Sequence, residues 1–162
     1  MRNVFLISLL FMVLFVSAQD TCRITRVIDG DTYELLCDSQ KSILRLMNVD
    51  APEKDQFYGQ RVTDTLSQML TGSLVTVHFQ KKDFYGRNLG QIHWNEIPLD
   101  SLLIANGWAW HYHAYSKDPS LAEVQDIARS DACGLWKCSY NVPPWIWRGL
   151  NRRNKRMHSF CK

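Results

Sequence analysis

The sequence predicts an α+β fold in which five short strands form a small barrel and three helices accompany them. Segments that alternate between apolar and polar side chains occur three times in the first part of the chain and twice more after residue 73. A helical apolar periodicity separates the two groups, and two further helical patterns follow the second group. Five strands with a helix between the third and the fourth are the order of an OB-fold barrel. An open α+β sheet has the same order and remains the alternative.

The first two strands are predicted as a hairpin over residues 23–36. The sequence partly alternates there around Asp29 and Gly30, and Asp-Gly is the strongest short-range signal for a hairpin turn. Cys22 and Cys37 lie almost symmetrically about this turn, so the hairpin would bring them opposite each other. We therefore expect a disulfide between these two cysteines.

The remaining elements follow from the same two periodicities. Pro52 ends the third strand, and Gly72 and Gly107 end the first two helices, because these residue types interrupt regular backbone structure. Ser120 is expected to cap the third helix. The expected elements are strands over 42–49, 74–79 and 89–94, and helices over 55–71, 98–105 and 121–128.

Residues 1–18 have the features of a removable export signal. Arg2 gives a positive start, an apolar run interrupted only by Ser8 spans 4–16, and Ala18 offers a small residue at a cleavage position. The run is shorter than the roughly 20 residues that a membrane-spanning helix needs. We therefore expect an exported protein, periplasmic or extracellular, with no membrane association after removal of the signal.

The mature chain is long enough for one domain, which we place at 19–148, followed by a basic tail over 149–162. From Arg148 onward, the last fifteen residues carry six basic side chains and no acidic one. Such a composition is typical of a segment that meets an anionic partner, such as nucleic acid or a membrane surface. A solvated end that only aids solubility fits it equally well, and both interpretations stay open. The mature protein is expected to be a monomer.

Five cysteines are present, and in an exported chain they indicate disulfides rather than a metal or redox centre. No C-x2-C pair occurs in the sequence. Cys133 and Cys138 could close a short loop, or Cys161 could pair with either of them. Their pairing stays open, and the odd number leaves one cysteine over.

Three charged stretches interrupt the expected strands and turns, at 28–32, 45–53 and 83–87. Each alone would suit an ordinary turn or a surface ion pair. Together they offer two arginines, which bind phosphate oxygens in a bidentate manner, and two aspartates with a backbone carbonyl, which suit a hard cation such as Ca²⁺. A third carboxylate beside the cation could orient or deprotonate a water molecule. The combination indicates metal-assisted chemistry on an anionic substrate.

These stretches resemble the staphylococcal nuclease (thermonuclease) family in their order and separation. The likeness lies in Asp-Gly-Asp-Thr at 29–32, in Arg45 with Val-Asp-Ala-Pro-Glu at 49–53, and in Tyr-Gly-Arg at 85–87. It continues through Gly-Trp-Ala at 107–109 and Gly-Leu-Trp at 134–136, and covers residues 22–148. The combined pattern is specific, whereas Asp-Gly-Asp alone is not.

The resemblance implies an OB barrel with three helices and a Ca²⁺-dependent endonuclease that acts on DNA and RNA. The implied roles are Asp31, Asp50 and the Ala51 carbonyl as metal ligands, Arg45, Glu53 and Arg87 as catalytic residues, and Tyr85 and Tyr115 in substrate binding. The arginines would bind the scissile phosphate and stabilise the transition state. The glutamate would act on the attacking water, as its general base or as its orienter. Asp29 matches the pattern but also fits a role in shaping the turn.

Departures from the family pattern concern substrate binding more than the metal site. Phe84 stands where a basic residue is common, and His113 stands where a second tyrosine of the nucleotide site is found. Ala51 replaces a threonine, which is compatible with ligation through its carbonyl. The stretch from Glu53 to Gly59 is short compared with a long mobile loop. Substrate preference and product pattern therefore stay open.

A non-catalytic nucleic-acid-binding module is the alternative function. The same barrel face and tail would then hold nucleic acid without hydrolysis, although the acidic and arginine residues that such modules typically lack are present here. His111 and His113 could place two imidazoles on one strand face. No third ligand accompanies them in the sequence, and packing is the more usual role of such a pair.

Overall fold

The structure is a computed structural model that describes residues 20–158. The expected signal at 1–18 and the last cysteine, Cys161, lie outside the described residues. None of the helices within the described range is long and apolar enough to cross a membrane.

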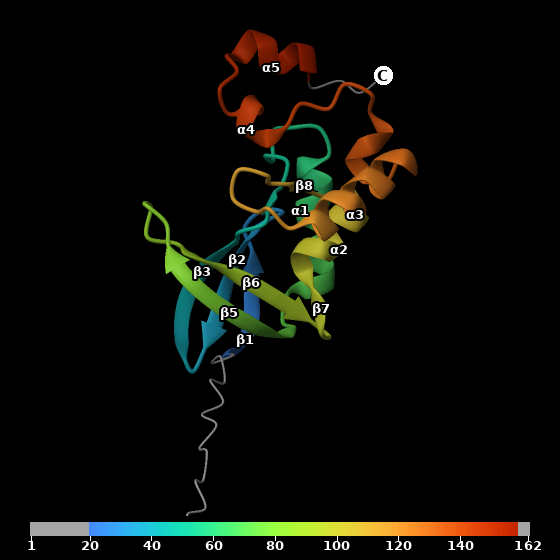
Figure 1. Ribbon diagram of the computed structural model, residues 1–162. Helices are drawn as coiled ribbons and strands as arrows, with labels where there is room; N and C mark the ends of the chain where they lie inside the picture. Colours follow the sequence, from blue (N-terminus) through green and yellow to red (C-terminus); the bar gives the residue numbers. More distant parts are fainter. Residues whose placement is uncertain (1–19, 159–162) are drawn as a thin grey trace, which may run out of the picture.

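Five strands close into a barrel (Figure 1). They are β1 (Asp20–Val27), β2 (Thr32–Cys37), β3 (Gln40–Leu46), β5 (Leu74–Lys82) and β6 (Asn88–Trp94). Antiparallel pairing runs in the order β3-β2-β1-β5-β6, and a parallel pairing between β3 and β6 closes the ring. The register of this closure places Arg45 beside Leu89. The barrel and its helices confirm the α+β, OB-type fold that the sequence predicts.

Short strands and helices complete the described chain. β4 (Val49–Asp50) pairs with β8 (Trp110–His111), and β7 (Ile97–Pro98) pairs with β6. The helical segments are α1 (Gly59–Leu70), α2 (Leu99–Ala105), α3 (Pro119–Ser130), the 3-10 helix η1 (Gly134–Lys137), α4 (Pro144–Trp147) and α5 (Arg152–His158). Helices α2 and α3 pack against each other beside the barrel, whereas α4 and α5 lie beyond its end, at the top of Figure 1.

The core joins the inside of the barrel to one face of α1. Leu35 and Leu44 are fully buried between the strands. Val62, Leu66 and Leu70 repeat at helical spacing along α1 and belong to the same buried cluster. The barrel and α1 therefore give the loops that connect the strands a closely packed support.

Helix α1 begins later than the sequence predicts, at Gly59 rather than at residue 55. The Gln56 N–H donates to the Glu53 carbonyl at 2.8 Å, and the Gly59 N–H donates to the Gln56 carbonyl at 3.0 Å. These bonds fold 53–59 into tight turns ahead of the helix. A side chain at Gly59 would not fit, because its Cβ would lie 1.9 Å from the Glu53 carbonyl oxygen.

Two other boundaries also differ from the predicted ones. The strand expected over 42–49 is two strands, β3 and β4, because the chain bends at 47 and 48. Helix α3 is capped by Asp118 and not by Ser120. The Asp118 carboxylate accepts the Ser120 N–H at 2.9 Å, and Pro119 takes the first helical position, where its missing N–H costs nothing.

Of the cysteines within the described residues, some form disulfides and one is a free thiol. The expected disulfide between Cys22 and Cys37 is present, with the two Cα atoms 4.4 Å apart, and it joins the start of β1 to the end of β2. Cys138 is disulfide-bonded, whereas Cys133 is free. A disulfide between Cys133 and Cys138, one of the pairings that the sequence left open, is therefore not formed.

Candidate active site

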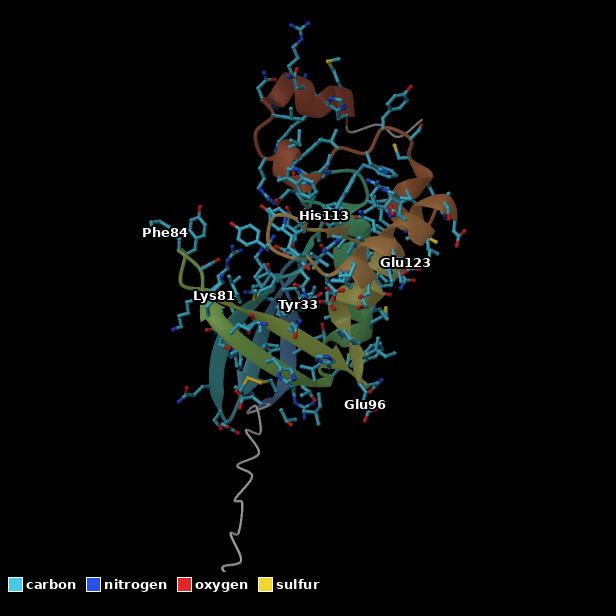
Figure 2. All side chains as sticks on the ribbon, in the orientation of Figure 1. Tyr33, Lys81, Phe84, Glu96, His113 and Glu123 are labelled. Atoms are coloured by element: carbon cyan, nitrogen blue, oxygen red, sulfur yellow. A yellow bond between two sulfur atoms is a disulfide. The ribbon has the colours of Figure 1, made fainter. Side chains whose placement is uncertain are left out.

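A pocket of about 600 Å³ opens at the end of the barrel that faces α4. Its inner wall consists of the β1–β2 turn, the end of β3 and the segment of β4 that runs on to Glu53. Its outer side consists of the tip of the β5–β6 hairpin, the loop after β8 and the end of α4. Figure 2 shows Phe84 at the outer end of that hairpin and Lys81 nearer to the barrel. The pocket thus has a wall built into the barrel and a rim of loops.

Asp31 is held at the inner wall by the turn that precedes it. The Asp29 carboxylate accepts the Asp31 N–H at 3.1 Å, which fixes the turn. The Asp31 carboxylate accepts the Ala51 N–H at 2.9 Å and the Thr32 hydroxyl at 3.0 Å. Burial raises the pKa of Asp31 to about 6, although the Arg45 guanidinium opposes the shift. A further positive charge, in addition to the Arg45 guanidinium, would stabilise the ionised form of Asp31.

Arg45 connects the two aspartates of the inner wall. Its Nη2 atom lies 3.2 Å from Asp31 Oδ2 and 2.7 Å from Asp50 Oδ1. The side chain is 14% exposed and points from the end of β3 between the two carboxylates. Because one nitrogen contacts both, the aspartates converge on a single point of the pocket.

Asp50 is fully buried on β4, which is paired to β8. Burial raises the pKa of its carboxyl, and the nearby Asp31 carboxylate adds to the rise. Hydrogen bonds and charge from Arg148 and Arg45 oppose it. Asp50 is therefore a buried carboxylate with two guanidinium partners.

Arg148 is a member of the site that the sequence did not reveal. Its Nη2 lies 2.7 Å from Asp50 Oδ2, and its Nη1 lies 3.1 Å from Asp50 Oδ1 and 2.9 Å from Glu53 Oε1. The hydrogen bond to Asp50 raises the pKa of Arg148 above its ordinary value. The sequence placed this residue at the boundary between domain and tail. A lone arginine 98 residues from Asp50 carries no local signal.

The segment that carries Arg148 is docked by the residue before it. Trp147 is buried, and its indole N–H donates to Asp55 Oδ1 at 2.9 Å. Lys155 on α5 forms an ion pair with the same carboxylate at 3.0 Å and lies over the Trp147 ring. The Gln56 side-chain amide also donates to the Val142 carbonyl.

Arg87 stands at the hairpin tip and is held by its own hairpin. Asp83 Oδ1 accepts the N–H groups of Tyr85 and Arg87, each at 2.9 Å, and Asp83 Oδ2 lies 2.7 Å from Arg87 Nε. Phe84 is 99% exposed and Tyr85 81% exposed. Arg87 lines the pocket, and its ion pair within the described chain is with Asp83, not with the inner wall.

Aromatic side chains form the remaining side of the rim. Tyr115 is exposed and lies against Tyr112, with the ring centroids 4.8 Å apart. Tyr112 stacks on Trp145 of α4 at 5.4 Å with nearly parallel rings. Both tyrosines line the pocket. Exposed aromatic faces next to a pocket that contains arginines can stack on nucleic-acid bases.

The histidine pair lies at the end of β8, which is paired with β4 of the inner wall. His111 is buried on β8, and neither of its ring nitrogens has a hydrogen-bond partner among the described residues. Its ring centroid lies 4.2 Å from that of His113. Within residues 20–158 no group of three or more His, Cys, Asp or Glu side chains is arranged to hold a metal ion.

Comparison with known proteins identifies the family. The sequence profile described as "Staphylococcal nuclease homologue" matches residues 43–138, a span that includes Arg45, Asp50, Glu53 and Arg87. The chain belongs to the staphylococcal nuclease family. The resemblance that the sequence motifs indicated is therefore confirmed.

Several relatives of this nuclease-family chain are similar over most of its length. A protein of Escherichia coli O157:H7, described as an uncharacterized endonuclease, is 44% identical over 128 residues, which are 78% of this chain and 83% of that protein. One of Haemophilus influenzae with the same description is 34% identical over 158 residues, 94% and 89% of the two chains. Staphylococcal-like nuclease CAN1 of Arabidopsis thaliana is 36% identical over 131 residues, 81% and 39% of the two chains.

The structure of this family member sorts the predicted residues into two sets. Asp31, Arg45, Asp50 and Glu53 belong to one connected network of ion pairs, which Arg148 completes. The Ala51 N–H donates to the Asp31 carboxylate, and Ala51 lines the same pocket as the network. Arg87, Tyr85 and Tyr115 line the same pocket from the rim.

Proposed function

We propose that this protein is an exported endonuclease that hydrolyses phosphodiester bonds of DNA and RNA with Ca²⁺ as its cofactor. The observation that carries the proposal is the network of buried carboxylates and guanidinium groups at one end of an open pocket. Family membership adds to it, because relatives are described as endonucleases.

Ca²⁺ fits the donors of the inner wall. Asp31 and Asp50 are buried, converge on one guanidinium nitrogen, and have pKa values that burial raises. Carboxylate oxygens, with the Ala51 carbonyl as a further donor, are ligands that Ca²⁺ prefers. A bound cation would supply positive charge for the phosphate and for the attacking water. With two protein carboxylates, water and substrate oxygens would have to complete its ligand set.

The arginines of the pocket are suited to a phosphodiester. A planar guanidinium donates two parallel hydrogen bonds to phosphate oxygens, and such donors stabilise the charge that develops in the transition state. Arg87 reaches the pocket from the rim and Arg45 from the inner wall. Glu53 is 37% exposed at the pocket, where its carboxylate can accept a proton from an attacking water. Tyr85 and Tyr115 offer exposed rings for the nucleotide.

The direct test is digestion of plasmid DNA and of RNA with and without a chelator. We expect cutting in the presence of Ca²⁺ and its loss when excess chelator is added. Undiminished cutting in chelator, or none in either condition, would contradict the metal-dependent reaction. A mobility shift with no products after long incubation would instead support the non-catalytic binding module.

Glu53→Ala tests the role of the carboxylate at the pocket. We expect a loss of about 3 kcal/mol of transition-state stabilisation, which is roughly a hundredfold in kcat/KM. Glu123→Ala is the matched control, because Glu123 is exposed on α3 and lies far from Phe84 in Figure 2. Single-turnover cleavage with radiolabelled or fluorescent DNA measures both. A wild-type rate in Glu53→Ala would refute the assigned role.

Export is proposed from the sequence of residues 1–18 and from the disulfide between Cys22 and Cys37, a bond that persists in oxidising compartments. Intact-mass analysis of the protein recovered from the periplasm or the medium should give a chain that begins at Gln19. A full-length chain retained in the cytoplasm would contradict this proposal.

A further inference from the structure

The acceptor positions of Asp50 are almost all taken in the structure. A carboxylate has about four lone-pair positions on its two oxygens. Asp50 Oδ1 accepts from Arg45 and Arg148, and Oδ2 accepts a second bond from Arg148. Arg148 therefore grips both oxygens, while Arg45 contacts one. A cation ligated by Asp50 would have to share or displace the bonds from Arg148.

The charge of the arginines also opposes the binding of a cation at Asp50. A guanidinium at hydrogen-bond distance from a carboxylate repels a divalent cation bound to that carboxylate, and burial strengthens the repulsion. Arg45 contacts Asp31 as well as Asp50, so it braces the two carboxylates against each other. Arg148 contacts Asp50 and Glu53 and comes from outside the barrel. Of the two arginines, Arg148 is the one whose release leaves the barrel wall intact.

Arg148 can leave Asp50 without undocking its segment. Its side chain is 43% exposed, whereas Trp147 is buried and bonded to Asp55. Lys155 holds the same aspartate from α5. The anchoring contacts of the segment are therefore separate from the contacts that Arg148 makes in the pocket.

We propose that Arg148 is a positioning residue that holds Asp50 and Glu53 in place before a cation binds and that competes with the cation for Asp50. This inference rests on the proposed function, since it takes Asp31 and Asp50 as the ligands of Ca²⁺. Its consequence is that the wild-type chain binds Ca²⁺ more weakly than its carboxylates alone would allow.

Calorimetric titration of Ca²⁺ into the metal-free protein, without nucleic acid and at low ionic strength, tests the competition. Arg148→Gln should bind Ca²⁺ roughly fivefold to tenfold more tightly than the wild type. Arg148→Lys, which keeps the charge but loses the bidentate grip, should lie between them. Arg152→Gln is the matched control, because it removes the same charge from the exposed start of α5 and should leave the affinity within about twofold.

Thermal melting gives a second readout. Without Ca²⁺, Arg148→Gln should melt below the wild type, because the buried Asp50 loses two hydrogen bonds, and added Ca²⁺ should raise its melting temperature by more than it raises that of the wild type. If Arg148→Gln does not fold, tighter binding by Arg148→Lys than by the wild type is the result that supports the proposal.

The outcomes separate this inference from the proposed function. Equal or weaker Ca²⁺ binding by the Arg148 variants, with normal binding by the wild type, would overturn the competition and leave the cation site in place. No Ca²⁺ binding by the wild type or any folded variant would contradict the cation site itself, and the competition with it.

Discussion

Arg45 and Arg87 line the same pocket from two regions of different construction. Arg45 belongs to the inner wall, where it is 14% exposed and contacts the buried carboxylates of Asp31 and Asp50. Arg87 belongs to the hairpin tip, where it is 34% exposed and pairs with Asp83, four residues earlier. One arginine is therefore fixed by the closed barrel, and the other by a local turn.

This difference separates stability from substrate contact. The contacts of the inner wall join β1–β2, β3 and β4, so they form only when those elements are assembled. The contacts of the tip lie within residues 83–87 and involve no other element, and the neighbouring side chains of Phe84 and Tyr85 are exposed. We expect changes at the inner wall to affect both folding and catalysis, and changes at the tip to affect catalysis or binding alone.

The largest effect should come from removing each arginine in turn. Arg45→Ala and Arg87→Ala should each lose about 3 kcal/mol of transition-state stabilisation. Only Arg45→Ala should also lower the free energy of unfolding, by about 3 kcal/mol, because it leaves two buried carboxylates without their shared partner. Chemical denaturation and single-turnover cleavage measure the two quantities.

Two outcomes would contradict this difference between the inner wall and the hairpin tip. If Arg87→Ala were as destabilising as Arg45→Ala, the tip would be part of the barrel's supporting structure. If Arg45→Ala were as stable as the wild type, the network of Asp31 and Asp50 would not depend on it.

A smaller effect is expected on stability when the pH is lowered, because His111 is buried next to the inner wall. Burial lowers the pKa of His111 below 6.5, and the charges of His113 and Lys117 add to this, while Asp118 and Asp100 oppose it. The unfolded chain therefore takes up a proton near pH 6.5 that the folded chain resists, so the contribution of His111 to stability falls as the pH falls below that value. Asp31, whose pKa burial raises to about 6, contributes in the opposite direction, so the difference between the wild type and a His111 variant isolates the histidine. Chemical denaturation at about pH 7.5 and about pH 5.5 measures the loss.

His111→Leu should reduce that pH-dependent loss, because the buried titrating group is gone. His158→Leu, at the exposed end of α5, should keep the wild-type dependence. An unchanged loss in His111→Leu would assign the acid sensitivity to another group.

The smallest effect should come from adding a charge at the tip. Phe84 is 99% exposed, so Phe84→Lys should leave the free energy of unfolding within about 0.5 kcal/mol of the wild type. A new phosphate contact should tighten DNA binding by about threefold at low salt and increase its salt dependence. Phe84→Gln is the uncharged control. Equal affinity for both variants would show that the tip does not reach the phosphate backbone.

Local signals predicted most of the barrel. The sequence around Asp29 and Gly30 predicted the two-stranded hairpin, although neither residue has the positive φ of a two-residue hairpin turn, and the disulfide between Cys22 and Cys37 follows from the symmetry of that hairpin. Boundaries were less well predicted, because the turns ahead of Gly59 depend on backbone bonds that the periodicity does not encode.

The site was predictable in part, and for a different reason. No rule of sequence spacing predicts that Asp31 and Asp50 both contact one nitrogen of Arg45. The family motif supplied that grouping, and the ion pairs agree with it. Arg148 matches no motif, and it reaches Asp50 only because Trp147 docks a distant segment. Contacts made by tertiary docking leave no periodic trace in the sequence.

The parallel pairing of β3 with β6 has a consequence for the order of events in folding. Each hairpin of the barrel can form from neighbours in sequence, but β3 and β6 meet only when a long intervening stretch has already collapsed, and such late, non-local contacts are slow. Arg45 is the last residue but one of β3, and Arg87 stands just before β6. A refolding chain should therefore regain its hairpins first. The time at which nuclease activity recovers should report when β3 pairs with β6 and the barrel closes.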